Sequence, residues 1–77
     1  MAYWIKRIIL KSGEVLTEQE LRTDENLFDG VPPFVGDEIT VTCRGRSFKA
    51  RVAWGYWPKD VGKYGPEKVI PLRAEEI

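Results

Sequence analysis

The feature that most limits the fold lies in residues 37–57, DEITVTCRGRSFKARVAWGYW, where apolar and polar side chains alternate along two segments around one glycine. This period of two is typical of strands that bury one face. The apolar set consists of Ile39, Val41, Cys43, Phe48, Ala50, Val52 and Trp54. We therefore predict a β-hairpin whose two arms turn these side chains toward one interior.

Gly45 is the expected start of the turn, because the first central residue of a type II′ turn needs a positive φ that glycine adopts without strain. A slip by one residue would bring the charge of Lys49 into the core, which disfavours that register. The predicted pairs are Cys43 with Phe48, Val41 with Ala50 and Ile39 with Val52, with Arg46 second in the turn. The outward face then carries Thr40, Thr42, Arg44, Lys49 and Arg51.

Three further segments have strand-like composition. Ala2–Leu10 is rich in aromatic and β-branched residues, and because both of its faces are largely apolar, we expect a central or strongly coiled strand. Glu14–Thr17 is a candidate for a short second strand. Glu67–Arg73 is the expected last strand, which Pro71 should confine to a sheet edge or break, because proline cannot donate to a ladder.

Residues Thr17–Asp29 allow two interpretations. Thr17 and Glu20 match a capping box, and Leu16 and Leu21 stand where a hydrophobic staple would need them. Few apolar residues follow, so a long helix would bury only a thin stripe. We expect an acidic loop that contains one helical turn.

Together these segments predict a single domain over residues 1–77, mainly β, with four or five short strands in an antiparallel sheet that coils to reduce its edges. A long loop near the start, a tight hairpin at Gly45 and a last strand with Pro71 resemble the SH3-like small barrels. That resemblance implies an SH3-like barrel fold. The ALYDY-like motif of signalling SH3 domains is missing, so their binding of proline-rich peptides is not implied.

Enzyme chemistry has little support in the composition. The chain has no histidine, which excludes Ser-His-Asp and Cys-His arrangements, and Cys43 is its one cysteine. We predict no catalytic residues, no metal site and no cofactor. Cys43 is expected to act as a small apolar side chain of the interior.

No targeting segment or membrane-spanning run is apparent, since an apolar run such as Ile8–Leu10 is too short for either. We expect a cytoplasmic protein without membrane contact. A monomer or a weak homo-oligomer agrees with the sequence.

The charges cancel overall but are segregated along the chain. Glu14–Glu38 contains eight acidic residues and one basic residue, whereas Ile39–Lys63 contains six basic residues and one acidic residue. The first interpretation is that the acidic half folds against the basic half. The alternative is a basic face that is kept for a partner.

The loop that follows the hairpin carries the first candidate binding site. Tyr56, Trp57 and Tyr64 lie in a stretch with three glycines and two prolines, although loops are usually polar. Such aromatic residues are enriched at interface anchors, so a protein or peptide partner is the first functional prediction. The alternative is that Trp57 and Tyr64 plug the open end of the barrel.

The second candidate is a nucleic-acid interface on the outward hairpin face. Basic side chains there could contact phosphates while the loop aromatics stack on bases. The residues concerned are Arg44, Arg46, Lys49 and Arg51. A net charge of zero weakens this interpretation, because long-range attraction to phosphate would be small.

Overall fold

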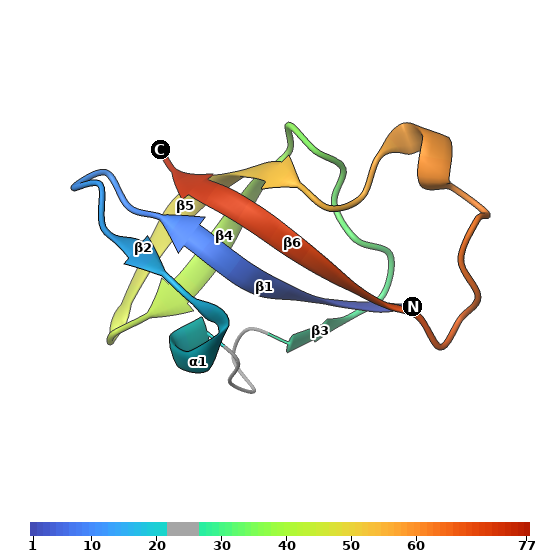
Figure 1. Ribbon diagram of the computed structural model, residues 1–77, viewed down its shortest axis with the longest axis horizontal. Helices are drawn as coiled ribbons and strands as arrows, with labels where there is room; N and C mark the ends of the chain where they lie inside the picture. The colour runs from blue at the N-terminus through green and yellow to red at the C-terminus, as the bar shows by residue number, and fades with distance from the viewer. Residues whose placement is uncertain (22–26) are drawn as a thin grey trace.

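A computed structural model describes residues 1–21 and 27–77. Half of the described chain is strand (Figure 1). The strands are β1 (Ala2–Ile9), β2 (Val15–Leu16), β3 (Leu27–Asp29), β4 (Glu38–Cys43), β5 (Arg46–Trp54) and β6 (Val69–Glu76), and the helices are α1 (Glu18–Leu21) and the 3-10 turn η2 (Pro58–Asp60). The predicted mainly-β domain is confirmed.

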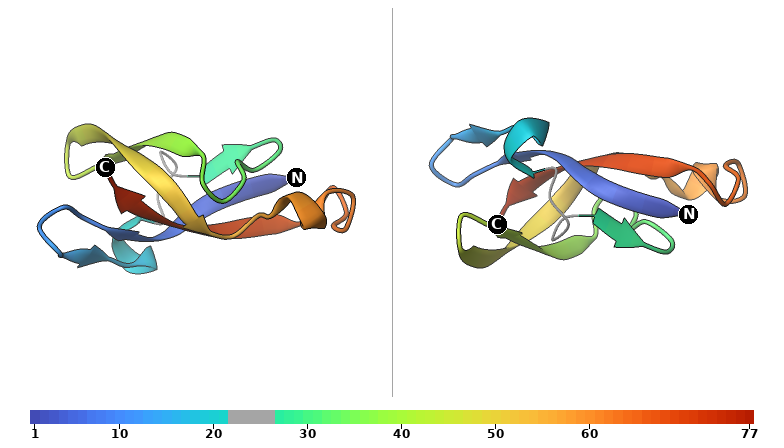
Figure 2. Two further views of the ribbon diagram at one scale, coloured as in Figure 1. Left: turned by 90° about the horizontal axis from the view of Figure 1, so that it is seen from above. Right: turned by 90° about the horizontal axis from the view of Figure 1, so that it is seen from below.

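The strands form one sheet in the order β2-β1-β6-β5-β4, and β3 pairs with the other end of β1. The pair β1–β6 is parallel, whereas the other pairs are antiparallel. Figure 2 shows the β4–β5 hairpin curling over β1 and β6. The expectation of an entirely antiparallel barrel is therefore wrong: the sheet is mixed and open, with β4 at one edge and β2 and β3 at the other.

The hairpin has the predicted faces but a different register. Val41 pairs with Phe48, and Cys43 pairs with Arg46, so every predicted pair is displaced by two residues. The turn residues are Arg44 and Gly45, with φ of 54° and 74°. Positive φ at both central positions defines a type I′ turn, whose twist matches that of the flanking strands. A displacement by two residues leaves each side chain on its predicted face.

A bulge explains why both faces of β1 are apolar. Ile5 and Ile8 are both fully buried, although side chains three positions apart in a regular strand lie on opposite faces. The register with β6 shifts between Ile5 and Arg7, so one extra residue of β1 is accommodated there. The shift reverses the alternation, and the inward side chains change from odd-numbered to even-numbered positions.

A second bulge corrects the prediction for Trp54. The register of β5 with β6 shifts between Val52 and Trp54. Val52 is buried as predicted, but Trp54 is 44% exposed and pairs with Arg73 on the outer face of the sheet. The predicted interior set therefore ends at Val52.

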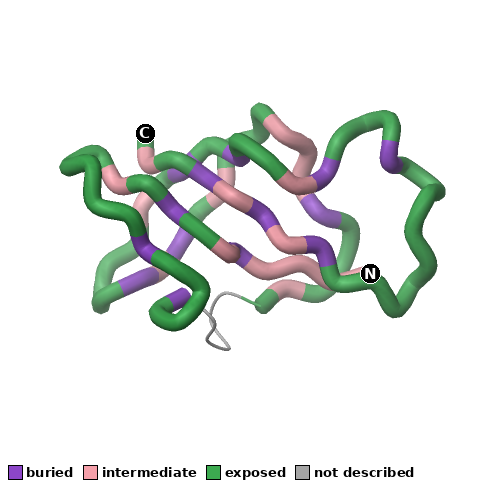
Figure 3. Tube along the Cα trace, in the orientation of Figure 1, coloured by how far each residue is buried: buried purple, intermediate pink, exposed green. Residues whose placement is uncertain are grey.

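The last strand is longer than predicted and central in the sheet. Along β6, buried and more exposed residues alternate (Figure 3), with Ile70, Leu72 and Ala74 inside. Pro71 pairs with β1 at Trp4, whereas pairing with β5 ends at Arg73. At Pro71, β6 therefore pairs with β1 alone. The strand is central in the sheet, but Pro71 itself occupies a local edge position, as proline requires.

The helical turn predicted near Glu18 is confirmed. The amides of Glu20 and Leu21 donate to the Thr17 carbonyl oxygen, each at 3.1 Å. Leu16 and Leu21 are buried in the common core. The rest of the predicted acidic loop, residues 22–26, lies outside the described residues.

The core collects one side of every long strand. Cys43 belongs to it with 7% exposure, as predicted for a free thiol on the inner face. Its buried apolar members are Ile5, Ile8, Leu16, Leu21, Val41, Cys43, Ala50, Val52, Tyr56, Ile70, Leu72 and Ala74. No helix among the described residues has the length and apolar character needed to cross a bilayer.

Candidate functional site

The two candidate sites lie at opposite ends of the molecule. The hairpin turn lies beside α1 at one end, and residues 55–68 with η2 form the other end (Figure 1). The loop aromatics and the basic residues of the hairpin turn therefore do not form one continuous surface.

The backbone of residues 55–68 is held by the side chain of a buried residue, Asp60. Asp60 is buried, and its Oδ2 accepts a hydrogen bond from the Trp57 amide at 3.2 Å. Its Oδ1 lies 3.6 Å from Lys63 Nζ. A buried carboxylate with these partners ties η2 to the residue before it and to the residues after it.

Tyr56 does not belong to the surface of this loop. Its side chain is 1% exposed, and its ring is parallel to that of Phe34, with the ring centroids 5.5 Å apart. Its carbonyl oxygen accepts a hydrogen bond from the Val35 amide at 2.9 Å. The ring of Tyr56 therefore fills the core and does not contribute to the exposed surface that the sequence predicted for this loop.

Trp57 and Tyr64 remain available at the surface, with 38% and 36% exposure. Val61, between them in the chain, is exposed to a greater degree. Lys68 Nζ lies 5.6 Å from the centroid of the Tyr64 ring, close enough for a cation–π interaction. These side chains give the loop an apolar surface with cations at its border.

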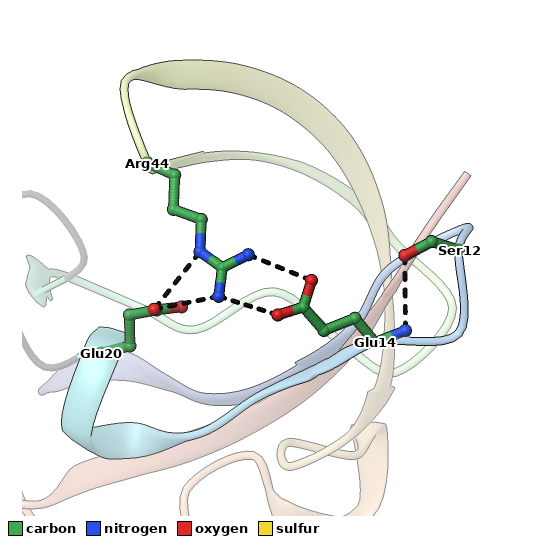
Figure 4. Close-up of polar contacts among 4 residues, drawn as sticks. All are labelled: Ser12, Glu14, Glu20 and Arg44. Carbon is green, nitrogen blue, oxygen red and sulfur yellow. Dashed lines mark hydrogen bonds and ion pairs between the residues drawn. The ribbon is translucent and has the colours of Figure 1, made fainter.

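Arg44 forms hydrogen bonds with two carboxylates of the same chain (Figure 4). Its two terminal nitrogens donate to the two carboxylate oxygens of Glu14 at 3.0 and 2.8 Å, and its Nε and Nη2 donate to Glu20 Oε1. The hydrogen bonds from Arg44 lower the pKa of Glu14. Glu14 precedes β2 at one edge of the sheet, and Arg44 follows β4 at the other edge. The cluster therefore joins the two open edges of the sheet, and Glu20 of α1 is the second partner of Arg44.

Two more cations of the hairpin face are paired within the chain. Arg46 contacts Glu76 at 3.2 Å, and Arg51 contacts Glu38 at 3.4 Å. Glu76 also accepts a hydrogen bond from the Lys11 amide, and these two contacts lower its pKa. The prediction that acidic segments fold against the basic hairpin is confirmed for the described residues. Of the four predicted nucleic-acid contacts, Lys49 is exposed and forms no ion pair with any residue that the structure describes.

A third group of residues was not predicted from the sequence. Arg73 pairs with Arg7 on one side and with Trp54 on the other, and a bulge in each neighbouring strand lies directly at that position. The guanidinium carbon of Arg73 lies 4.9 Å from the centroid of the Trp54 ring. The sequence contained one signal of this arrangement, the loss of alternation in β1, but did not reveal which strand would lie beside it.

Within residues 1–21 and 27–77, no three His, Cys, Asp or Glu side chains gather in a way that could hold a metal ion. Comparisons with protein-family models, with curated proteins and with solved structures gave no match to this chain.

Proposed function

We propose that this protein is a non-catalytic interaction module that binds a protein or peptide partner through the surface formed by Trp57, Val61 and Tyr64. The observation that carries the proposal is the partial exposure of both aromatic rings on a loop whose backbone is anchored by buried Asp60. A prearranged apolar surface loses little conformational entropy on binding. Aromatic residues are also the side chains most enriched among interface anchors.

The general form of the molecule supports the same proposal. The proposed likeness to SH3-like barrels rests on small size, a coiled sheet and a tight central hairpin, while the parallel β1–β6 pair departs from the antiparallel pattern expected at first. Small domains of this kind act mainly through loops carried on a rigid sheet. The internal ion pairs of Arg44, Arg46 and Arg51 argue against the alternative of a nucleic-acid site on the hairpin face.

A peptide-library selection tests the proposal. Random peptides displayed on phage are selected against the full chain, and each enriched peptide is then measured against Trp57→Ser and Tyr64→Ser. Ile77→Ser is the matched control, because Ile77 is an apolar residue of similar exposure at the end of the molecule away from residues 55–68 (Figure 1).

We expect an enriched peptide family whose binding weakens at least about tenfold in each loop variant, the effect of losing one interface anchor. Ile77→Ser should bind as the unchanged protein does. Binding that is equally strong in the loop variants, or a library without enrichment, would contradict the proposal.

A further inference from the structure

Two bulges converge on one residue of the central strand. Arg73 lies between buried Leu72 and Ala74, so the alternation of β6 places Arg73 on the outer face. On β1 the register shift brings Arg7 opposite Arg73, and on β5 the shift brings Trp54 opposite the same residue. Bulges of this kind redirect side chains and occur frequently beside functional sites.

The resulting arrangement opposes stability in two respects. Arg7 and Arg73 are cross-strand neighbours of equal charge, and such pairs destabilise a sheet. Arg73 Nε is buried without a hydrogen-bond partner among the described residues, which leaves a polar group without compensation for its lost hydration. Locally destabilising features of this kind are expected at functional sites, including ligand-binding sites.

These arginines also differ from the other arginines on neighbouring strands. Arg46 and Arg51 each contact a carboxylate, whereas neither Arg7 nor Arg73 forms an ion pair in the described part of the chain. Glu75, the next outward residue of β6, pairs in register with Arg51 and forms no ion pair with either of them. Within residues 1–21 and 27–77, the two guanidinium groups thus have no anionic partner.

We propose that the outer face around Arg7, Trp54 and Arg73, here called the Arg73 face, binds an acidic segment of a partner protein. A guanidinium matches a carboxylate with two parallel hydrogen bonds, and two adjacent guanidinium groups suit a segment with closely spaced acidic side chains. The carboxylates would also remove the repulsion between Arg7 and Arg73.

Apolar neighbours favour a protein segment over a nucleic acid. Ile9 and Val69 are exposed on the strands that carry this face, and Trp54 is partly exposed although Arg73 lies over its ring. Arginine and tryptophan beside aliphatic side chains are typical of interface centres. A nucleic acid would gain little from the overall charge of zero. The Arg73 face is distinct from the Trp57 loop surface, so either site can exist without the other.

The test is a titration of the ¹⁵N-labelled chain followed through the arginine Nε–H resonances and the Trp54 indole resonance. The probes are a synthetic peptide of five Glu and two Leu residues, the same peptide with Gln in place of Glu, and single-stranded oligothymidylate. The variants are Arg7→Gln, Arg73→Gln and Arg73→Lys. Arg51→Gln is the control, because it removes an arginine that already has a carboxylate partner.

We expect the Glu peptide to shift the resonances of Arg7, Arg73 and Trp54, and the Gln peptide to leave them unchanged. Arg7→Gln and Arg73→Gln should each weaken binding about tenfold, and Arg51→Gln should change it less than about twofold. Because Arg7 is exposed, Arg7→Gln should fold, and it still tests binding if Arg73→Gln does not fold. Arg73→Lys keeps the charge and should still weaken binding, because lysine lacks the planar pair of donors.

No shift at millimolar Glu peptide would overturn the proposal, as would shifts that persist in Arg7→Gln and Arg73→Lys. Binding of the oligothymidylate in preference to the Glu peptide would overturn the acidic segment as the partner. Trp57→Ser should bind the Glu peptide as the unchanged chain does, which separates this result from that of the loop surface.

Discussion

The ring of Tyr56 stacks on the ring of Phe34 at an interplanar angle of 2°, while the next residue, Trp57, points part of its ring to solvent. The two neighbours therefore have different roles. The stack joins the residues before β4 to the residues after β5, and the hydrogen bond from the Val35 amide to the Tyr56 carbonyl oxygen reinforces this contact.

Tyr56→Ala should destabilise the protein by about 3–5 kcal/mol, the usual cost of removing a buried aromatic ring. Trp57→Ala should cost less than about 1 kcal/mol, because much of that side chain is solvated in the native state. Urea denaturation of both variants, with Tyr64→Ala as a second exposed control, measures the difference. Equal losses in Tyr56→Ala and Trp57→Ala would contradict the assignment of Tyr56 to the core.

Gly55→Ala should destabilise the protein because the added methyl group has no space. A Cβ at this position would overlap with Leu72 Cδ2 and lie 2.9 Å from the Pro71 carbonyl oxygen, and φ is +144°. Overpacking and backbone strain together should cost about 2–4 kcal/mol. Gly62→Ala is the control, since its positive φ is accompanied by open space and it should lose less stability. Thermal unfolding of both variants decides, and similar losses would contradict the close contact at Gly55.

Three substitutions at Arg44 separate its backbone role from its ion pairs. Arg44→Asn creates an Asn-Gly turn, which favours type I′ geometry, but removes the contacts with Glu14 and Glu20. Arg44→Gly also removes these contacts and tolerates the turn, whereas Arg44→Ala removes them and strains the turn. We expect the urea midpoint to fall in the order Asn, Gly, Ala. A midpoint for Arg44→Ala above that for Arg44→Gly would exclude the type I′ turn.

Acid should weaken the protein through Glu14 and Glu76. Their pKa values lie below the ordinary 4.5, for Glu14 because Arg44 donates hydrogen bonds to it and for Glu76 because the Lys11 amide and Arg46 do. A lowered native pKa means that the contribution to stability is complete above the unfolded pKa and is lost as pH falls through the native value. Glu14→Gln and Glu76→Gln should flatten this dependence between about pH 6 and pH 3 in urea unfolding. Unchanged slopes in both variants would show that these carboxylates are not paired in solution.

The alternation in residues 37–57 was sufficient to predict which side chains of the hairpin face the interior as far as Val52, but not the register of the two strands. A displacement by two residues keeps every side chain on its face, so the apolar pattern cannot distinguish the two registers. The choice depends on Arg44, which adopts a positive φ that is uncommon outside glycine and asparagine. Its contacts with Glu14 and Glu20 come from distant segments and were not apparent in the local pattern.

The bulges limited the prediction of the candidate sites in the same way. Alternation alone placed Trp54 inside, and only its pairing with Arg73 across a register shift explains its exposure. The parallel pairing of β1 with β6 joins the two ends of the chain, and no local signal indicates such a partner. Likewise, the sequence identified residues 55–66 as an aromatic loop but could not distinguish Tyr56, which stacks on Phe34, from Trp57, which does not.

Hydroxyl-radical footprinting tests the division of the loop aromatics between core and surface most directly. Oxidation of each side chain is measured by mass spectrometry, first for the free chain and then with a library-selected peptide bound. We predict rapid oxidation of Trp57 and Tyr64, strong protection of Tyr56, and protection of Trp57 and Tyr64 once the peptide is bound. Oxidation of Tyr56 at the rate of Tyr64, or a bound peptide that leaves Trp57 and Tyr64 as reactive as before, would contradict the account.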